Sequence, residues 1–87
     1  MATVIANHRV SNYSTWKVGF DGDQGNRDAA GITTLAVGER ADDPGMVYII
    51  FDVKDPSVMQ SFMNNPELQQ KMKELGVISA PEHIILN

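Results

Sequence analysis

The sequence contains no cysteine, which excludes disulfide bonds and thiolate metal sites. It has two histidines and no acidic cluster at the spacing of metal ligands, so we expect no bound metal. Its seven glycines are scattered and form no phosphate-binding loop between a strand and a helix. No serine lies in a nucleophile-elbow motif. We therefore expect neither a metal nor a cofactor.

Basic residues are also few. The sequence has seven Lys and Arg residues and eleven Asp and Glu residues, which give a net charge of −4. The pI is about 4.8. An acidic surface disfavours nucleic-acid backbones and anionic membranes. No apolar run approaches the ~20 residues of a membrane span, and the residues after Met1 resemble a strand rather than a signal peptide. We expect a cytoplasmic protein without nucleic-acid or membrane partners.

The length leaves room for a single domain, which we place at residues 1–87. A monomer of this mass buries roughly 63% of the surface of its unfolded chain, which is marginal for a domain without cross-links.

The first half of the chain predicts a strand, a helix and a hairpin. Residues 3–10 alternate with period two, as a strand does. Ser11 or Asn12 can cap a helix that is regular through about Phe20 and looser through residue 28, and Gly31 suits a left-handed helix cap. Residues 32–40 and 46–54 are predicted to pair across a turn at residues 41–45.

The second half predicts a broken helix and a last strand. Asp55-Pro56 and Asn65-Pro66 each have the residues of a helix start, so the second helix is expected to break near Asn65-Pro66 and to end at Gly76. Residues 77–87 are expected to form the final strand.

This order of elements predicts the ferredoxin-like α+β fold, βαββαβ, in which both helices cover one face of a four-stranded antiparallel sheet. The other face is also apolar in places. Residues 46–54 have apolar side chains on both faces of their strand, and so does the last strand. A solvated sheet face should be polar. We therefore expect a homodimer through the sheet face. Tyr48, Ile50 and Asp52 are predicted to point away from the helices. In the last strand, Ile84 and Leu86 are predicted to lie on one face and Ile85 on the other.

His8 is the first candidate for chemistry. It is the only polar side chain on the strand face formed by Val4, Ala6 and Val10, which is predicted to face the helices. Its ordinary pKa near 6.5 suits an acid or a base at neutral pH. The alternative is a core histidine that is hydrogen-bonded to the backbone.

Two charged residues near the first helix are further catalytic candidates. Asp21 could orient His8 and fix its tautomer, or could be an exposed helix acid. Arg27 could bind a carboxylate or an enolate, or could pair with Asp23.

Aromatic side chains offer a candidate ligand surface. Tyr13, Trp16 and Phe20 recur at helical spacing beside glycines that leave room for a planar molecule, and Phe51 is predicted to face the same space. The alternative is an ordinary hydrophobic core.

A set of short motifs runs along nearly the whole chain: His8-Arg9-Val10, Tyr13, Trp16-Lys17, Phe20-Asp21, Arg27, Ala30-Gly31-Ile32, Asp42-Asp43-Pro44, Pro66-Glu67-Leu68, Met72, Leu75-Gly76-Val77 and Pro81-Glu82. In these residues the chain resembles a branch of the dimeric α/β-barrel superfamily that includes the antibiotic-biosynthesis-monooxygenase-like proteins. The resemblance implies two ferredoxin-like protomers whose sheets form a barrel, each with a small cavity between sheet and helices.

Relatives in this superfamily oxidise polycyclic phenols without a cofactor, break down haem or isomerise lactones. The resemblance implies a cofactor-independent monooxygenase-like or cyclase-like enzyme for a small aromatic or enolisable molecule. The monooxygenase-like members use an Asn, a Trp and a Tyr or His near the cavity, whereas here His8 holds the polar position of the first strand and the single Trp is Trp16. The alternatives are a non-catalytic ligand-binding or stress-response dimer, and a purely structural dimerisation module.

Overall fold

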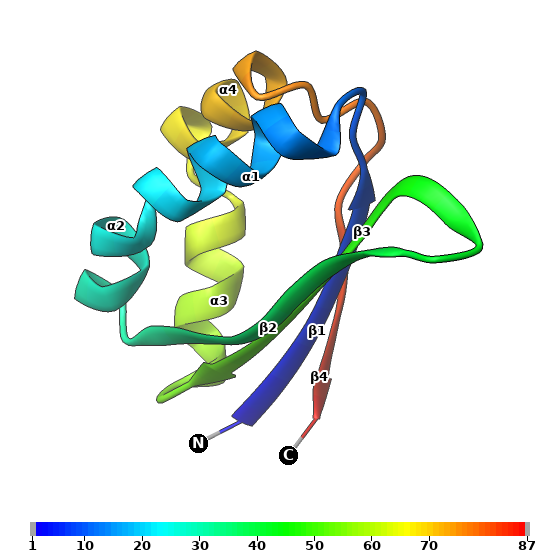
Figure 1. Ribbon diagram of the computed structural model, residues 1–87. Helices are drawn as coiled ribbons and strands as arrows, with labels where there is room; N and C mark the ends of the chain where they lie inside the picture. The colour runs from blue at the N-terminus through cyan, green and yellow to red at the C-terminus, as the bar shows by residue number, and fades with distance from the viewer. Residues whose placement is uncertain (1, 87) are drawn as a thin grey trace.

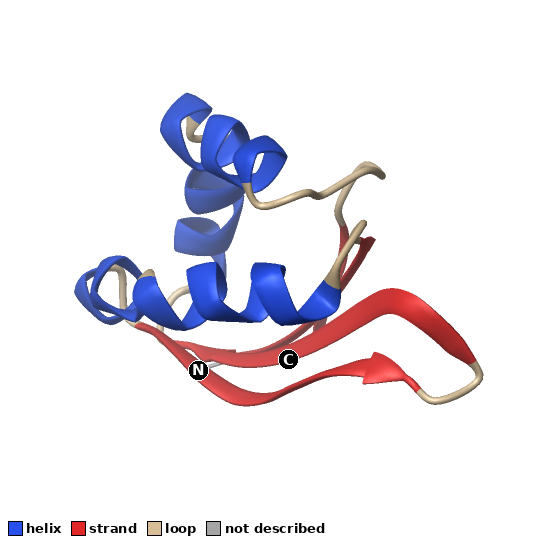
Figure 2. Ribbon diagram, turned by 45° about the horizontal axis from the view of Figure 1, so that its top comes forward, coloured by secondary structure: helices blue, strands red, loops and turns tan. Residues whose placement is uncertain are grey.

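The computed structural model describes residues 2–86, and its four strands form one antiparallel sheet with the order β2-β3-β1-β4. All the helices lie on one side of this sheet (Figures 1 and 2). The predicted ferredoxin-like α+β fold is therefore confirmed. The elements are β1 (Ala2–Arg9), α1 (Tyr13–Gly22), α2 (Gln24–Ala29), β2 (Ile32–Arg40), β3 (Asp43–Val53), α3 (Pro56–Met63), α4 (Pro66–Glu74) and β4 (Glu82–Leu86).

The core lies between the helices and the central strands β1 and β3. Side chains of β1 alternate between buried and half-buried along its whole length. Val4 pairs with Phe51 and His8 pairs with Val47, so their buried side chains share the helix-facing side of the sheet. The period-two pattern of the sequence thus positions His8 on the side that faces the helices.

The first helical segment differs from its prediction. Asn12 is the cap of α1, and its side chain accepts a hydrogen bond from the Thr15 amide at 3.1 Å. Beyond it the helix does not become loose: Asp23 separates α1 from the second regular helix α2, and its carboxylate accepts a hydrogen bond from Asn26 at 2.6 Å. Gly31, with φ of +76°, has the predicted left-handed conformation.

The β2–β3 hairpin is confirmed, but its turn is shorter than predicted. Only Ala41 and Asp42 separate the strands, and Pro44 and Gly45 belong to β3. Gly45 has φ of +94°; its N–H donates to the Glu39 carboxylate and its carbonyl accepts from the Val10 amide. These contacts hold Gly45 inside the strand. Figure 1 shows the hairpin extending beyond the rest of the sheet.

The second helix breaks as predicted, into α3 and α4. The side chains of Asp55 and Asn65 cap these helices by accepting hydrogen bonds from the amides of Ser57 and Glu67. Each helix has a proline in its first turn, and Pro cannot continue the preceding helix.

The last strand is shorter than residues 77–87. β4 begins at Glu82, after Pro81, and Val77 forms only an isolated bridge with Val10. The segment between them still contacts β1: the Ile78 amide donates to the Arg9 carbonyl, and Ser79 Oγ accepts a hydrogen bond from the Arg9 amide, each at 2.8 Å. Pro81 has no N–H to donate to a strand ladder. The predicted end of the strand, Asn87, lies outside the described residues.

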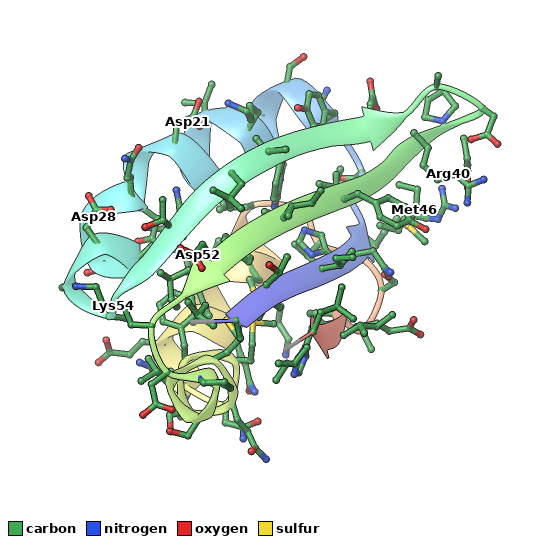
Figure 3. The ribbon with its side chains drawn as sticks, turned by 90° about the horizontal axis from the view of Figure 1, so that it is seen from below. Asp21, Asp28, Arg40, Met46, Asp52 and Lys54 are labelled. Carbon is green, nitrogen blue, oxygen red and sulfur yellow. The ribbon has the colours of Figure 1, made fainter. Side chains whose placement is uncertain are left out.

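Figure 3 shows the sheet from the side opposite the helices. The strand pairing places an apolar row across all four strands on this face. Ile50 pairs with Ala36 on one side and with Ile5 on the other, and Ile5 pairs with Ile84. We call these four residues the apolar row. The neighbouring positions are more polar, apart from the exposed Leu86. They are Gly38, Tyr48, Asn7 and Glu82 on one side, and Thr33, Asp52, Thr3 and Leu86 on the other.

None of the helices within residues 2–86 has both the length and the apolar character needed to cross a membrane.

Candidate functional site

A cavity of about 70 Å³ lies between the helices and the sheet. Five of the seven residues predicted for catalysis or ligand binding line it, from β1, α1, α2 and β3. Its remaining walls come mainly from apolar side chains of α3 and α4, including Met59, Met63 and Met72. The five predicted residues are His8, Trp16, Phe20, Arg27 and Phe51.

His8 is 5% exposed, and its Nε2 atom has no hydrogen-bond partner within the described residues. Its ring meets Trp16 edge-on, with 5.3 Å between centroids and 68° between planes. Burial lowers the pKa of His8 to about 4, because a charged imidazolium is poorly solvated there. The imidazole is therefore neutral at pH 7. No backbone group satisfies Nε2, in contrast to the core-histidine alternative.

The aromatic side chains of α1 form a continuous stack along the cavity. Trp16 and Phe20 are stacked with centroids 4.9 Å apart and planes at 24°, and Phe20 meets Phe51 at 6.4 Å. Tyr13 does not line the cavity; it packs behind Trp16 at 5.9 Å. The stack supplies a flat apolar wall.

Arg27 extends this stack with a positive charge. Its guanidinium carbon lies 3.8 Å from the centroid of the Phe20 ring, and the residue is 4% exposed. Within residues 2–86 its side chain takes part in no hydrogen bond or ion pair, and its buried Nε has no partner. Burial lowers the pKa of Arg27, but a guanidinium remains protonated in proteins.

Asp23, the sequence-based alternative partner of Arg27, is bound to other groups. Its carboxylate accepts hydrogen bonds from Lys71 at 2.8 Å and from Asn26 at 2.6 Å. Burial alone would raise the pKa of Asp23, but these two hydrogen bonds and the positive charges of Lys71 and Arg27 together outweigh it and lower that pKa. Asp23 acts on Arg27 through its electric field rather than by a direct contact.

The Asp23–Lys71 ion pair is a feature of the site that sequence reasoning missed. It joins the junction of α1 and α2 to α4, across 48 residues of sequence, and both side chains line the cavity. One signal was available. Lys71 lies three residues after Leu68 and four before Leu75, so this cation falls on the apolar face of its helix.

Asp21 does not line the cavity. Its carboxylate accepts both of its hydrogen bonds from Lys17, each at 2.7 Å, and the pair is exposed on α1. Figure 3 shows Asp21 on the outer side of that helix. The predicted contact between Asp21 and His8 is therefore not formed, and its position fits the exposed-acid alternative.

A larger groove of about 540 Å³ lies between α4 and the segment that leads into β4. It contains His83 and Lys73, but all of its polar side chains are exposed. Within residues 2–86, no group of three His, Asp or Glu side chains is placed to hold a metal ion. The His8 cavity is therefore the better candidate site, because it contains buried polar atoms without partners.

Several solved structures share the fold of this chain. A candidate antibiotic biosynthesis monooxygenase from Bordetella bronchiseptica matches with a TM-score of 0.79 and 15% identity, over 99% of this chain and 94% of that one. A mutant of SnoaB, a cofactor-independent oxygenase from Streptomyces nogalater, matches with a TM-score of 0.69 and 14% identity, over 99% and 90%. An uncharacterised NIPSNAP domain protein from Burkholderia xenovorans matches with a TM-score of 0.66 and 9% identity, over 100% and 93%.

The chain thus has the same ferredoxin-like fold as solved structures described as antibiotic biosynthesis monooxygenases, which is the fold that the resemblance implied. Within that class, residues 1–85 match the family described as "Domain of unknown function (DUF3764)", and the chain belongs to this family. No curated protein matches it.

Proposed function

We propose that this protein is a cofactor-independent enzyme of the monooxygenase-like or cyclase-like kind, acting on a small aromatic or enolisable molecule in the His8 cavity. One observation carries the proposal: a neutral imidazole and a guanidinium, both buried and both with unpartnered nitrogen atoms, line one cavity beside an aromatic stack.

In the proposed reaction, His8 Nε2 accepts a proton from a phenolic O–H or from a C–H beside a carbonyl. The substrate becomes a phenolate or an enolate, and the guanidinium of Arg27 stabilises its oxygen. Trp16 and Phe20 hold the apolar body of the substrate. An electron-rich phenolate can itself reduce oxygen, which is the reason that such a reaction needs no cofactor. The SnoaB neighbour, described as a cofactor-independent oxygenase, is consistent with this route.

The low pKa of His8 affects its strength as a base. An imidazole with a pKa of about 4 is a weak proton acceptor at neutral pH. A negative charge that develops on the substrate beside it favours the imidazolium and raises this pKa again. His8 is thus expected to become a stronger base as the proton moves.

The same observation supports a second candidate function, a binding protein without chemistry. If the pKa of His8 stayed near 4 when the cavity was filled, His8 would act only as a hydrogen-bond partner of a retained ligand.

Replacing His8 by glutamine separates these two functions. Phenylacetone serves as a neutral, enolisable, single-ring probe, and the exchange of its α-protons for deuterium is followed by NMR. Wild-type protein is expected to accelerate the exchange about 100-fold more than His8→Gln, the lower range for a positioned general base. His83→Gln, which removes the exposed histidine of β4, is the matched control and should behave as wild type.

Equal exchange by wild type and His8→Gln would contradict the enzymatic proposal. Native mass spectrometry then tests the alternative, which expects a small molecule that stays bound during purification and is unchanged after incubation.

We also propose that the protein is a homodimer in which the apolar row binds its own copy. A two-fold axis that passes through the row places Ile50 and Ile5 against their counterparts. The more polar positions on both sides of the row are typical of the rim of an interface. Covering this face adds burial that a chain of this size lacks.

A further inference from the structure

The charged side chains that line the His8 cavity carry one uncompensated positive charge. They are Arg27, Lys71 and Asp23. Asp23 and Lys71 neutralise each other through their 2.8 Å ion pair, and His8 is neutral at pH 7. The charge of Arg27 remains.

Other acidic residues near Arg27 do not neutralise this charge by contact. Asp21 is bound to Lys17, and Asp28 is exposed on α2, as Figure 3 also shows. Glu67 is exposed in the outer groove beside Lys71. Solvent screens the fields of these exposed carboxylates.

The position of Arg27 leaves its hydrogen-bonding edge available. The guanidinium carbon lies over the Phe20 ring, 3.8 Å from its centroid, and the ring cannot accept the in-plane hydrogen bonds of the guanidinium. The buried Nε has no hydrogen-bond partner within the described residues. A planar guanidinium of this kind binds carboxylates and enolates through two parallel hydrogen bonds. Burying it with no partner is costly, and a bound anion would remove that cost.

The size of the cavity limits the body that carries the anion. Its volume of about 70 Å³ is smaller than the roughly 150 Å³ of an engineered apolar cavity that binds benzene in another protein. Met63 and Met72 are half-buried in its wall, and methionine side chains adjust readily to new shapes. A cavity of this volume, widened by such adjustment, suits a body of about one aromatic ring.

We propose that the natural ligand of this cavity is a compact monoanion, with one negatively charged group bound by Arg27 and an apolar body no larger than a single aromatic ring. This inference rests on the proposed function in one respect, that the cavity is a ligand site. It does not require that His8 transfers a proton.

Four single-ring or two-ring probes test the charge and the size of the ligand separately. They are benzoate, neutral benzamide, the dianion phthalate and the larger monoanion 2-naphthoate, titrated at pH 7 and constant ionic strength with binding followed by NMR chemical shifts. Benzoate is expected to bind about tenfold more tightly than benzamide, the effect of one charged hydrogen bond, and also more tightly than phthalate and 2-naphthoate.

Variants assign these preferences to residues. Arg27→Gln is expected to remove the preference for benzoate over benzamide, whereas Arg40→Gln, which removes an exposed guanidinium at the hairpin, should retain it. Arg27→Lys keeps the charge and is expected to keep a weaker preference, which provides a test if Arg27→Gln does not fold. Met63→Ala should improve the binding of 2-naphthoate most.

Several results would overturn the inference: no benzoate binding at millimolar concentration, equal binding of benzamide, tighter binding of phthalate or 2-naphthoate, or an unchanged charge preference in Arg27→Gln. His8→Gln distinguishes this failure from that of the proposed enzyme. If His8→Gln loses proton exchange but wild type shows no preference for benzoate over benzamide, only the proposed class of ligand is wrong. If the preference is present but proton exchange does not depend on His8, only the enzymatic proposal is wrong.

Discussion

Ile50→Asp is expected to dissociate the protein into single chains at micromolar concentration. Ile50 is central in the apolar row, with Ala36 and Ile5 as its cross-strand neighbours. In a two-fold dimer the substitution places two carboxylates in the covered face, and burying unpaired carboxylates is costly. We expect dimer affinity to fall at least about 100-fold, or ~2.7 kcal/mol. Sedimentation equilibrium over a range of concentrations measures this change directly.

Val18→Asp is the matched control for this substitution. Val18 is 74% exposed on α1, on the side of the molecule that carries the helices. The substitution therefore adds the same charge away from the sheet face. It should leave the dimer intact. A wild-type protein that is a stable, folded monomer at micromolar concentration would contradict the dimer proposal, as would equal dissociation of both variants.

Acid is expected to destabilise the protein through His8. The pKa of His8 is about 4 in the folded protein and near 6.5 when it is unfolded. Between these values the unfolded chain binds more protons than the folded one, so the free energy of unfolding decreases as the pH falls. The effect begins near pH 6.5, is complete just below pH 4, and amounts to about 3 kcal/mol for a shift of this size.

Comparison with His8→Gln isolates this contribution from those of the carboxylates. The stability of wild type relative to the variant should fall by about 3 kcal/mol between pH 7 and pH 4, measured by urea denaturation at one fixed protein concentration because a dimer's stability depends on concentration. His83→Gln, at the exposed histidine, should follow wild type across the whole range. Parallel pH profiles for wild type and His8→Gln would show that His8 is not held neutral by burial.

Parts of the site could be predicted because they depend on local periodicity. His8 is on the helix-facing side of β1 because alternate residues of a strand share a face, and Trp16 and Phe20 stack because residues four apart meet on a helix. The partner of Asp23 could not be found in this way. Lys71 is 48 residues away, and local patterns do not indicate which distant cation a carboxylate will reach.

The turn of the hairpin also depends on residues that are distant in sequence. Pro44-Gly45 has the composition of a turn, and a local interpretation placed the turn at residues 41–45. In the folded protein, Gly45 instead binds Glu39 and the backbone of Val10. Val10 directly follows β1 and is far from the hairpin in sequence. Only the assembled sheet could therefore select the two-residue turn at Ala41 and Asp42.

The sequence by itself determined the order of the elements, the helix starts at Asp55 and Asn65, and the apolar character of both sheet faces, since alternation, capping and turn propensities act over a few residues. Only the tertiary structure decided that the Arg27 guanidinium is buried against Phe20 without a partner and that Asp23 binds Lys71. Burial and the pairing of charges depend on which distant segments pack together, and these two properties give the cavity its positive charge.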